Sequence, residues 1–292
     1  MGQGGDNTRA ALIMTLSMAG YALNDTCLKA LGEDLPLGQV LFLRGALTSA
    51  LIGGWVMWHG LWRVGLSGSD WVRVALRTLG EVAAAFFFIS ALFHMPLANV
   101  TAILQVLPLT VSLAAALFLG DTLGWRRVSA IAVGFCGVML IVQPGASGFN
   151  SYTLYALLAV AAITLRDLST RRLDGSVPTM IVVLFGSLGV MCLGGALGPG
   201  EVWLALDVRA TFLLIASALF ILAAYVCSVA VMRIGDVAAV APFRFTGLLW
   251  ALVLGYLAFG EFPGPVTLIG ASIVVATGAF TFYRERAMSK QE

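Results

Sequence analysis

The chain has 292 residues, of which 60% are hydrophobic and only 11% are charged, and its formal net charge at neutral pH is +2. Its mean hydropathy of +0.95 excludes a globular protein that faces water on all sides and predicts one that spans a membrane several times. We therefore expect membrane lipid, and no nucleic acid, among its partners.

Ten apolar segments follow one another along the chain, each close to the roughly 20 helical residues that cross a bilayer core of about 30 Å. They cover residues 10–29, 37–58, 70–92, 96–119, 125–142, 152–171, 177–198, 208–232, 236–258 and 266–283. The segments are continuously apolar, without the alternation of a membrane β-barrel. The first is too long for a secretory signal, and no small-residue cleavage site follows it. The sequence thus predicts an all-α membrane protein with ten transmembrane helices.

Basic residues are distributed unevenly over the ends of these segments. The side that holds both termini carries Arg9, Arg63, Arg126, Arg127, Arg171, Arg172, Arg233, Arg284, Arg286 and Lys290. The other side carries only Lys29 and Arg209. Because basic residues are retained on the cytoplasmic side, we predict cytoplasmic N- and C-termini for a multi-pass protein of the cell inner (plasma) membrane.

The chain contains one five-segment block twice. A shift of 140 positions lays the fourth and fifth segments on the ninth and tenth, with Gly120 on Gly260, and a shift of 142 places Asp25 on Asp167. Because five is odd, the second block enters the membrane from the opposite face, an arrangement typical of transporters. We predict a first repeat at residues 1–142, a second, inverted repeat at 151–283 and a cytoplasmic tail at 284–292. The turn-rich stretch 143–148 separates the repeats.

The order and spacing of several features resemble the EamA-type exporters of the drug/metabolite transporter superfamily, and most closely its bacterial exporters of amino acids, including aromatic ones. Besides the repeats, the resemblance rests on Arg44 early in the second helix, Pro108 inside the fourth, and the pairs Gly120-Asp121 and Gly260-Glu261. The chain departs from the family in having Asp121 in place of Glu, and Leu248 at the position equivalent to Pro108. The resemblance implies two pseudo-twofold inverted repeats around a central cavity lined by helices one, three, four, six, eight and nine.

Counted inward from the segment ends, seven charged residues lie four or more positions inside the predicted spans: Asp25, Arg44, Arg77, Glu81, Arg166, Asp167 and Arg244. A charge at mid-bilayer costs about 2.5–3.5 kcal/mol, so each should face a partner or a wet cavity. Arg77 and Glu81 can pair because they are four residues apart on one helical face. Matching depths would also let Asp25 reach Arg44 and Asp167 reach Arg244. We favour a structural role for Asp25 and Arg44, and a functional role for Glu81 and Arg244.

The embedded charges also bear on the substrate. Four arginines against three carboxylates leave no surplus of negative charge, unlike a pump for hydrophobic cations. An arginine can hold a substrate carboxylate by a two-pronged hydrogen bond. Aromatic rings with a polar group would add a broad apolar surface, and amide side chains would add neutral hydrogen bonds. We therefore predict a substrate cavity lined by Tyr21, Asn24, Glu81, Asn99, Gln105, Tyr225, Arg244 and Trp250.

Two prolines are predicted to bend transmembrane helices. Pro108 removes the backbone hydrogen bond to Leu104 and should kink the fourth helix, and Pro242 can do the same near the start of the ninth. These bends are candidate hinges for alternating access. Static kinks that only shape a cavity are the alternative.

No motif for catalysis or nucleotide binding is found. HExxH, a metal-ligand cluster and a Walker-type loop are absent from the sequence, so we expect no metal, no cofactor and no direct use of ATP. The string 145–148 matches the GxSG of rhomboid proteases, but His59 and His94 lie at span ends, which argues against an intramembrane enzyme. We predict a secondary transporter, monomeric or weakly dimeric, that exports aromatic and other neutral amino acids and related small metabolites. The alternative is a multidrug transporter that expels lipophilic cations.

Overall fold

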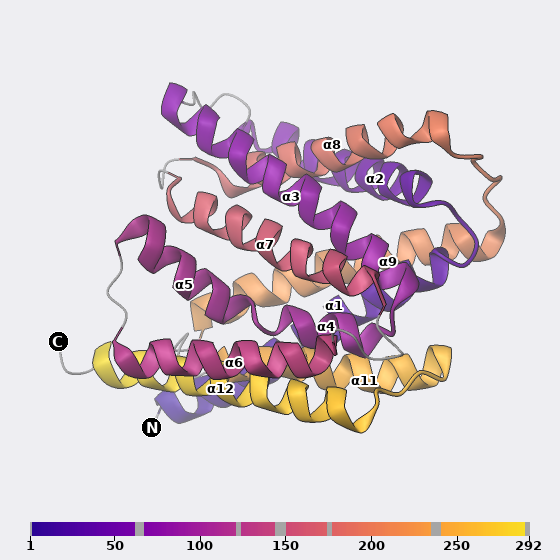
Figure 1. Ribbon diagram of the computed structural model, residues 1–292. Coiled ribbons are helices and arrows are strands. Elements are labelled where there is room, and N and C mark those ends of the chain that lie inside the picture. The colour runs from indigo at the N-terminus through magenta and orange to yellow at the C-terminus, as the bar shows by residue number, and fades with distance from the viewer. Residues whose placement is uncertain are drawn as a thin grey trace. The chain divides into compact units, whose positions relative to one another are not determined.

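The computed structural model describes residues 2–61, 67–120, 124–143, 150–173, 177–234 and 241–289. In these ranges all regular structure is helical (Figure 1), and it forms ten helical segments when consecutive helices that continue one another, such as residues 97–104 and 107–119, are counted as one. The α-helices are α1 (Gly2–Leu31), α2 (Leu37–Trp58), α3 (Gly68–His94), α4 (Leu97–Leu104), α5 (Leu107–Leu119), α6 (Trp125–Val142), α7 (Tyr152–Arg171), α8 (Thr179–Leu197), α9 (Val208–Ile234), α11 (Thr246–Phe259) and α12 (Pro265–Ser289). Two short 3-10 helices are η2 (Gly198–Gly200) and η3 (Ala241–Phe245). The predicted all-α fold is confirmed.

Seven of these segments are long and apolar enough to cross a membrane: Leu37–Trp58, Gly68–His94, Leu97–Leu119, Tyr152–Arg171, Thr179–Gly200, Val208–Ser228 and Pro242–Phe259. Two further apolar stretches, Val128–Val142 and Pro265–Phe280, are shorter. The prediction of ten spans is therefore confirmed for seven within the described residues. The helix α12 also continues through Ser289, so most of the predicted tail at 284–292 is helical.

The helices gather into two compact units. Unit 1 comprises Met1–Cys27, His94–Thr153 and Ile215–Glu292, and unit 2 comprises Leu28–Phe93 and Leu154–Leu214. Unit 1 thus holds most of α1 and α9 with α4, α5, α6, α11 and α12, whereas α2, α3, α7 and α8 form unit 2. Each compact unit takes helices from both predicted repeats. The repeat boundaries remain a prediction, and residues 144–149 between the repeats lie outside the described residues.

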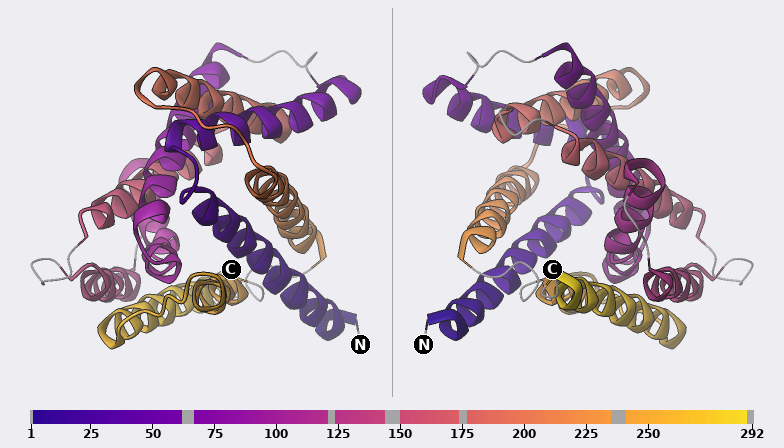
Figure 2. Two further views of the ribbon diagram at one scale, coloured as in Figure 1. Left: turned by 90° about the vertical axis from the view of Figure 1, so that its right-hand side faces the viewer. Right: turned by 90° about the vertical axis from the view of Figure 1, so that its left-hand side faces the viewer.

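In unit 2, α2 and α8 lie side by side with their backbones in contact (Figures 1 and 2). A Cβ atom added to Gly194 would lie 2.3 Å from the backbone nitrogen of Phe42, and one added to Gly45 would lie 2.7 Å from that of Met191. Small residues allow this approach, as is common between membrane helices. The residue numbers rise along α2 while those of the partners fall along α8, so the two helices are antiparallel.

In unit 1, α6 and α12 form an equivalent close pair. A Cβ on Gly270 would lie 2.6 Å from the carbonyl oxygen of Gly137, and one on Gly134 would lie 3.0 Å from Oγ1 of Thr277. These contacts also run in opposite directions along the two helices. Both units therefore contain an antiparallel helix pair packed through glycine.

The connection from α8 to α9 is tied to the start of α2. The side-chain amide of Gln39 donates to the carbonyl of Leu204 (2.7 Å) and accepts from its backbone N–H (2.9 Å). The carboxylate of Glu201 accepts a hydrogen bond from the backbone N–H of Gly38 (2.9 Å). An acidic group at this helix N-terminus satisfies a free donor and complements the helix dipole.

The fourth segment is interrupted just before Pro108, as its sequence predicts. The helix α4 ends at Leu104 and α5 begins at Leu107, with Pro108 in its first turn. Proline cannot donate the hydrogen bond that would join the two helices. The ninth segment begins with η3, which contains Pro242, and continues as α11. Whether either bend acts as a hinge remains a prediction.

The glycines of the two small-plus-acidic pairs end helices in the same way. Gly120 follows α5 with φ +80° and Gly260 follows α11 with φ +65°, a left-handed conformation that glycine adopts without steric cost. Glu261 then turns back, and its carboxylate accepts a hydrogen bond from the N–H of Leu97 at the start of α4 (3.2 Å). Asp121 lies outside the described residues.

Candidate functional site

Four charged side chains form one connected cluster within unit 2. The predicted pair of Arg77 and Glu81 on α3 is confirmed, with Nη2 and Oε2 3.6 Å apart. Nη1 of Arg166 on α7 approaches the same Oε2 atom at 3.5 Å. The Nε and Nη2 atoms of Arg166 each lie 2.9 Å from Oδ1 of Asp167. Two guanidinium groups therefore share two carboxylates.

Glycines bring the three helices of this cluster together. A Cβ on Gly80 would lie 2.9 Å from the backbone nitrogen of Arg166, so α3 and α7 touch at that turn. On α8, a Cβ on Gly186 would lie 3.2 Å from both Nη1 of Arg77 and Cγ of Glu81. Since neither glycine has a side chain, the long arginine side chains can reach across the helix contacts.

The cluster is buried unevenly. Glu81 is the middle residue of the 27-residue α3. The exposed fraction of the side chain rises from 12% for Arg77 to 28% for Arg166, 30% for Glu81 and 40% for Asp167. Charged groups that remain partly open in the middle of a membrane span require water or a polar ligand beside them. The cluster can therefore offer both a cation and an anion to a small polar molecule.

The role of Arg166 was not predicted from the sequence. The predicted partner of Asp167 was Arg244, which belongs to unit 1, and the structure pairs Asp167 with Arg166. The predicted pair of Asp25 and Arg44 also joins residues of the two different units and stays a prediction. Nothing in the sequence pattern shows that α3 and α7 are neighbours, so the contact between Arg166 and Glu81 could not be derived.

The structure brings two of the predicted aromatic residues together in unit 1. Tyr21 of α1 and Trp250 of α11 both pack against one apolar cluster, formed by Ala10, Met14, Met18 and Val231. Tyr225 of α9 is half-buried. These positions are compatible with an apolar surface for a substrate, and that role remains a prediction.

The predicted polar and charged residues of unit 1 differ in burial and in their hydrogen-bond partners. Asn24 is only 2% exposed, and its amide donates to Asp25 (2.9 Å). The amide of Gln105 approaches the carbonyl of Phe245 at 3.5 Å. Within the described part of the chain, the buried Oδ1 atom of Asn99 has no hydrogen-bond partner. Arg244 lies in η3 and is exposed. Their contribution to substrate binding is likewise a prediction.

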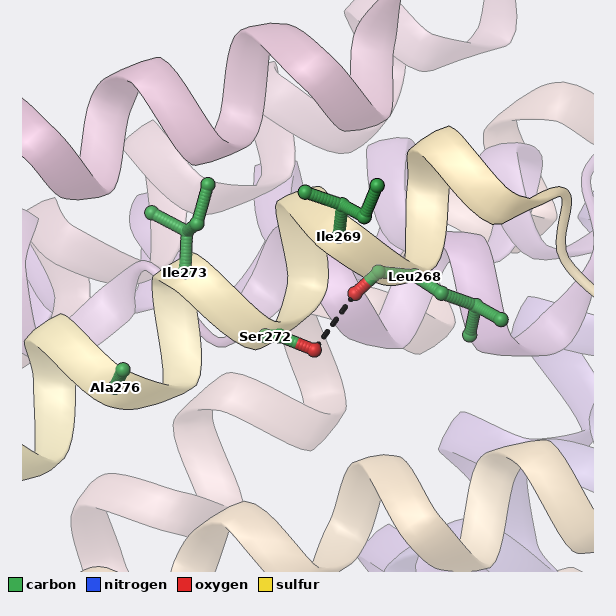
Figure 3. Close-up of a pocket in the computed structure, with 5 residues that line it drawn as sticks. All are labelled: Leu268, Ile269, Ser272, Ile273 and Ala276. Atoms are coloured by element: carbon green, nitrogen blue, oxygen red, sulfur yellow. Dashed lines mark hydrogen bonds between the residues drawn. The ribbon is translucent and has the colours of Figure 1, made fainter.

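A separate open groove lies on one face of α12 (Figure 3). Its lining comes from this single helix and consists of Leu268, Ile269, Ser272, Ile273 and Ala276. The hydroxyl of Ser272 donates to the carbonyl of Leu268 in its own helix (2.8 Å), which leaves an essentially apolar surface. This groove includes none of the predicted substrate residues. In the described ranges, no group of three or more His, Cys, Asp or Glu is placed to hold a metal ion.

Comparison with known proteins places the chain among transporters. Residues 8–143 match the EamA-like transporter family. The chain is 28% identical to the S-adenosylmethionine uptake transporter of Rickettsia bellii (strain RML369-C) over 94% of both chains. It is 28% identical to a riboflavin transporter of Rhizobium johnstonii over 73% of this chain and 69% of that protein. It is 24% identical to the pseudopaline exporter CntI of Pseudomonas aeruginosa (strain UCBPP-PA14) over 90% of this chain and 92% of the exporter.

A solved crystal structure shares the fold with a TM-score of 0.61 and 20% identity, over 96% of this chain and 99% of its own. The predicted family resemblance is confirmed. Residues 8–143 thus form an EamA-like transporter domain, in a multi-pass membrane protein whose named relatives are transporters and not enzymes.

Proposed function

We propose that this protein is a secondary transporter for small metabolites that carry an amino-acid head group. The observation that carries the proposal is the cluster of Arg77, Glu81, Arg166 and Asp167, which is central in α3 and partly open. An amino acid presents a carboxylate and an ammonium group on one carbon, and the cluster presents charges that complement both. Charge-assisted hydrogen bonds of this kind are among the strongest polar contacts.

The names of the relatives support this substrate class. S-adenosylmethionine contains the α-ammonium and α-carboxylate groups of methionine, so the substrate named for the Rickettsia relatives is itself an amino-acid derivative. Riboflavin has no such group, and the relative named for it matches a smaller share of the chain. The proposal therefore covers S-adenosylmethionine as well as the neutral amino acids predicted from the sequence.

The contacts between α2 and α8 support two inverted repeats. Gly45 contacts Met191, and Ser49 donates to Ser187 (2.9 Å). Under the shift of 142 positions, Gly45 corresponds to Ser187 and Ser49 to Met191. Exchanging the two repeats therefore converts the first contact into the second. A twofold axis between antiparallel helices produces this reciprocity.

The pair of α6 and α12 repeats the pattern with the shift of 140. Gly134 faces Thr277, and Gly137 faces Val274 (3.0 Å for each added Cβ). Exchanging the repeats converts one contact into the other. We propose alternating access by two inverted repeats in the inner membrane, with both termini cytoplasmic.

Uptake into proteoliposomes tests the substrate class. We expect labelled S-adenosylmethionine or methionine to show saturable counterflow, and unlabelled amino acids to compete. Inhibition by cationic dyes without competition by amino acids would instead establish the alternative, efflux of lipophilic cations. Measurements in both vesicle orientations, with and without a pH gradient, separate export from uptake and identify coupling to protons.

A substitution in the cluster tests the site itself. Glu81→Gln keeps the shape of the side chain but removes its charge, so we expect amino-acid transport to fall by about 10- to 100-fold, the loss of one charged hydrogen bond. The matched control is Glu33→Gln, which removes a carboxylate that pairs with Arg209 and is 57% exposed. Equal transport by both variants would refute the proposed site.

A further inference from the structure

We propose that Arg166 binds the carboxylate of the substrate, which replaces Glu81 as a partner of this arginine. Arg77 keeps its contacts and remains paired with Glu81. This inference rests on the proposed function and assigns separate tasks to two arginines of one cluster. The sequence favoured Arg244 for the carboxylate. The assignment to Arg166 follows from the different surroundings of the two guanidinium groups within unit 2.

Arg77 is fixed by the protein. Its Nη1 atom donates to the carbonyl of Val182 in α8 (3.3 Å), and its Nη2 atom faces Glu81 (3.6 Å). Gly186 of α8 leaves room for this guanidinium because it has no side chain: a Cβ there would lie 3.2 Å from Nη1. With 12% of its side chain exposed, Arg77 has little surface for a ligand.

Arg166 is more accessible than Arg77, and its contact with Glu81 is longer than its contact with Asp167. More than a quarter of its side chain is exposed (28%). Asp167 holds Nε and Nη2 at 2.9 Å, whereas Nη1 reaches Glu81 only at 3.5 Å, the long limit of a hydrogen bond. Since a guanidinium carries five N–H donors, a carboxylate of the substrate can bind at Nη1 by a shorter and stronger contact.

The exchange leaves every charge of the cluster paired. When the substrate carboxylate occupies Arg166, Glu81 remains beside Arg77 and can accept the ammonium group of the same substrate. Removing a partner from a buried charge without replacing it is strongly unfavourable. A molecule that carries both groups is therefore admitted, whereas one that lacks the carboxylate leaves Arg166 with its original partners.

Competition by methionine and by methionine methyl ester tests this assignment, because the ester keeps the ammonium group and lacks the carboxylate. For the wild-type protein we expect the ester to compete at least about tenfold more weakly than the acid. In Arg166→Gln this preference should fall to about twofold or less, because the cation that distinguishes the two compounds is gone. In Arg77→Gln both compounds should bind more weakly, and the preference for the acid should persist.

A second variant keeps the assignment testable if Arg166→Gln does not fold. Arg166→Lys retains the charge but lacks the planar two-pronged donor, so the preference should be reduced without being lost. An unchanged preference in a folded Arg166 variant, or a preference lost in Arg77→Gln alone, would overturn the inference and leave the proposed function standing. A wild-type protein that binds neither compound would instead refute the proposed function, and this inference with it.

Discussion

Replacement of Gly194 by alanine should destabilise the protein through the contact of α2 with α8. The added Cβ would lie 2.3 Å from the backbone nitrogen of Phe42 and 2.6 Å from the carbonyl oxygen of Gly38, where ordinary contact begins at 3.4 Å. Both neighbours are backbone atoms, so no side chain can rotate away. The helices must separate by about 1 Å, which weakens most dispersion contacts along their interface.

Overpacking of this kind costs about 1–3 kcal/mol. Alanine favours a helix over glycine by about 1 kcal/mol, which offsets part of the loss. We therefore expect Gly194→Ala to lower the free energy of unfolding by up to about 2 kcal/mol and the melting temperature by up to about 8 °C.

The neighbouring glycine is a matched control. A Cβ on Gly195 would lie 3.5 Å from the ring of Phe42, an ordinary contact. Gly195→Ala should therefore leave stability unchanged or raise it by up to about 1 kcal/mol. Thermal unfolding of the purified protein in detergent compares the two variants. If Gly194→Ala and Gly195→Ala have the same melting temperature, the close approach of the two backbones is not what stabilises the pair of α2 and α8.

Three further substitutions test other features of the fold. Pro108→Ala restores a backbone donor at the break between α4 and α5, so we expect a lower rate of counterflow with an unchanged half-saturating concentration. Glu261→Gln removes the negative charge at the N-terminus of α4 and should lower the free energy of unfolding by about 0.3–1 kcal/mol, measured by thermal unfolding. Gln39→Ala removes both hydrogen bonds to Leu204 and should speed amide hydrogen exchange in residues 202–206.

Each of these predictions has a result that contradicts it. An unchanged counterflow rate in Pro108→Ala would make the break a static kink. Glu33→Gln, which removes an exposed carboxylate that pairs with Arg209, is the control for Glu261→Gln, and equal melting temperatures would mean that the cap contributes nothing. For Gln39→Ala, faster exchange throughout α2 as well would indicate loss of helix packing and not of the loop contact.

The sequence predicts the helices well because their signals are local. The predicted segments 37–58, 125–142 and 152–171 coincide with α2, α6 and α7. Proline and glycine also act locally, so the break before Pro108 and the pair of Arg77 and Glu81 on one helical face could be foreseen. Hydropathy alone is less informative about α1, whose polar residues keep it out of the clearly membrane-spanning set.

Contacts between helices could not be predicted in the same way. Apolar membrane helices differ little in their side chains, so composition does not show which faces meet. The close approach at Gly80, which sets Arg166 beside Glu81, depends on the neighbours of α3 and not on its own sequence. Depth in the membrane suggested Arg244 as the partner of Asp167, but depth does not distinguish helices that lie at the same level.

Synthesis of the chain must leave the glycine-lined face of α2 exposed to lipid for some time. Gly45 meets its neighbour Met191 only after nearly half of the protein has been added. At about 5–20 residues per second, this delay is roughly 7–30 s. By the end of this interval the first five segments have been synthesised, while the face of α6 that α12 will cover is still unoccupied. Folding of unit 2 is therefore completed by lateral association of inserted helices, after the first half has left the ribosome.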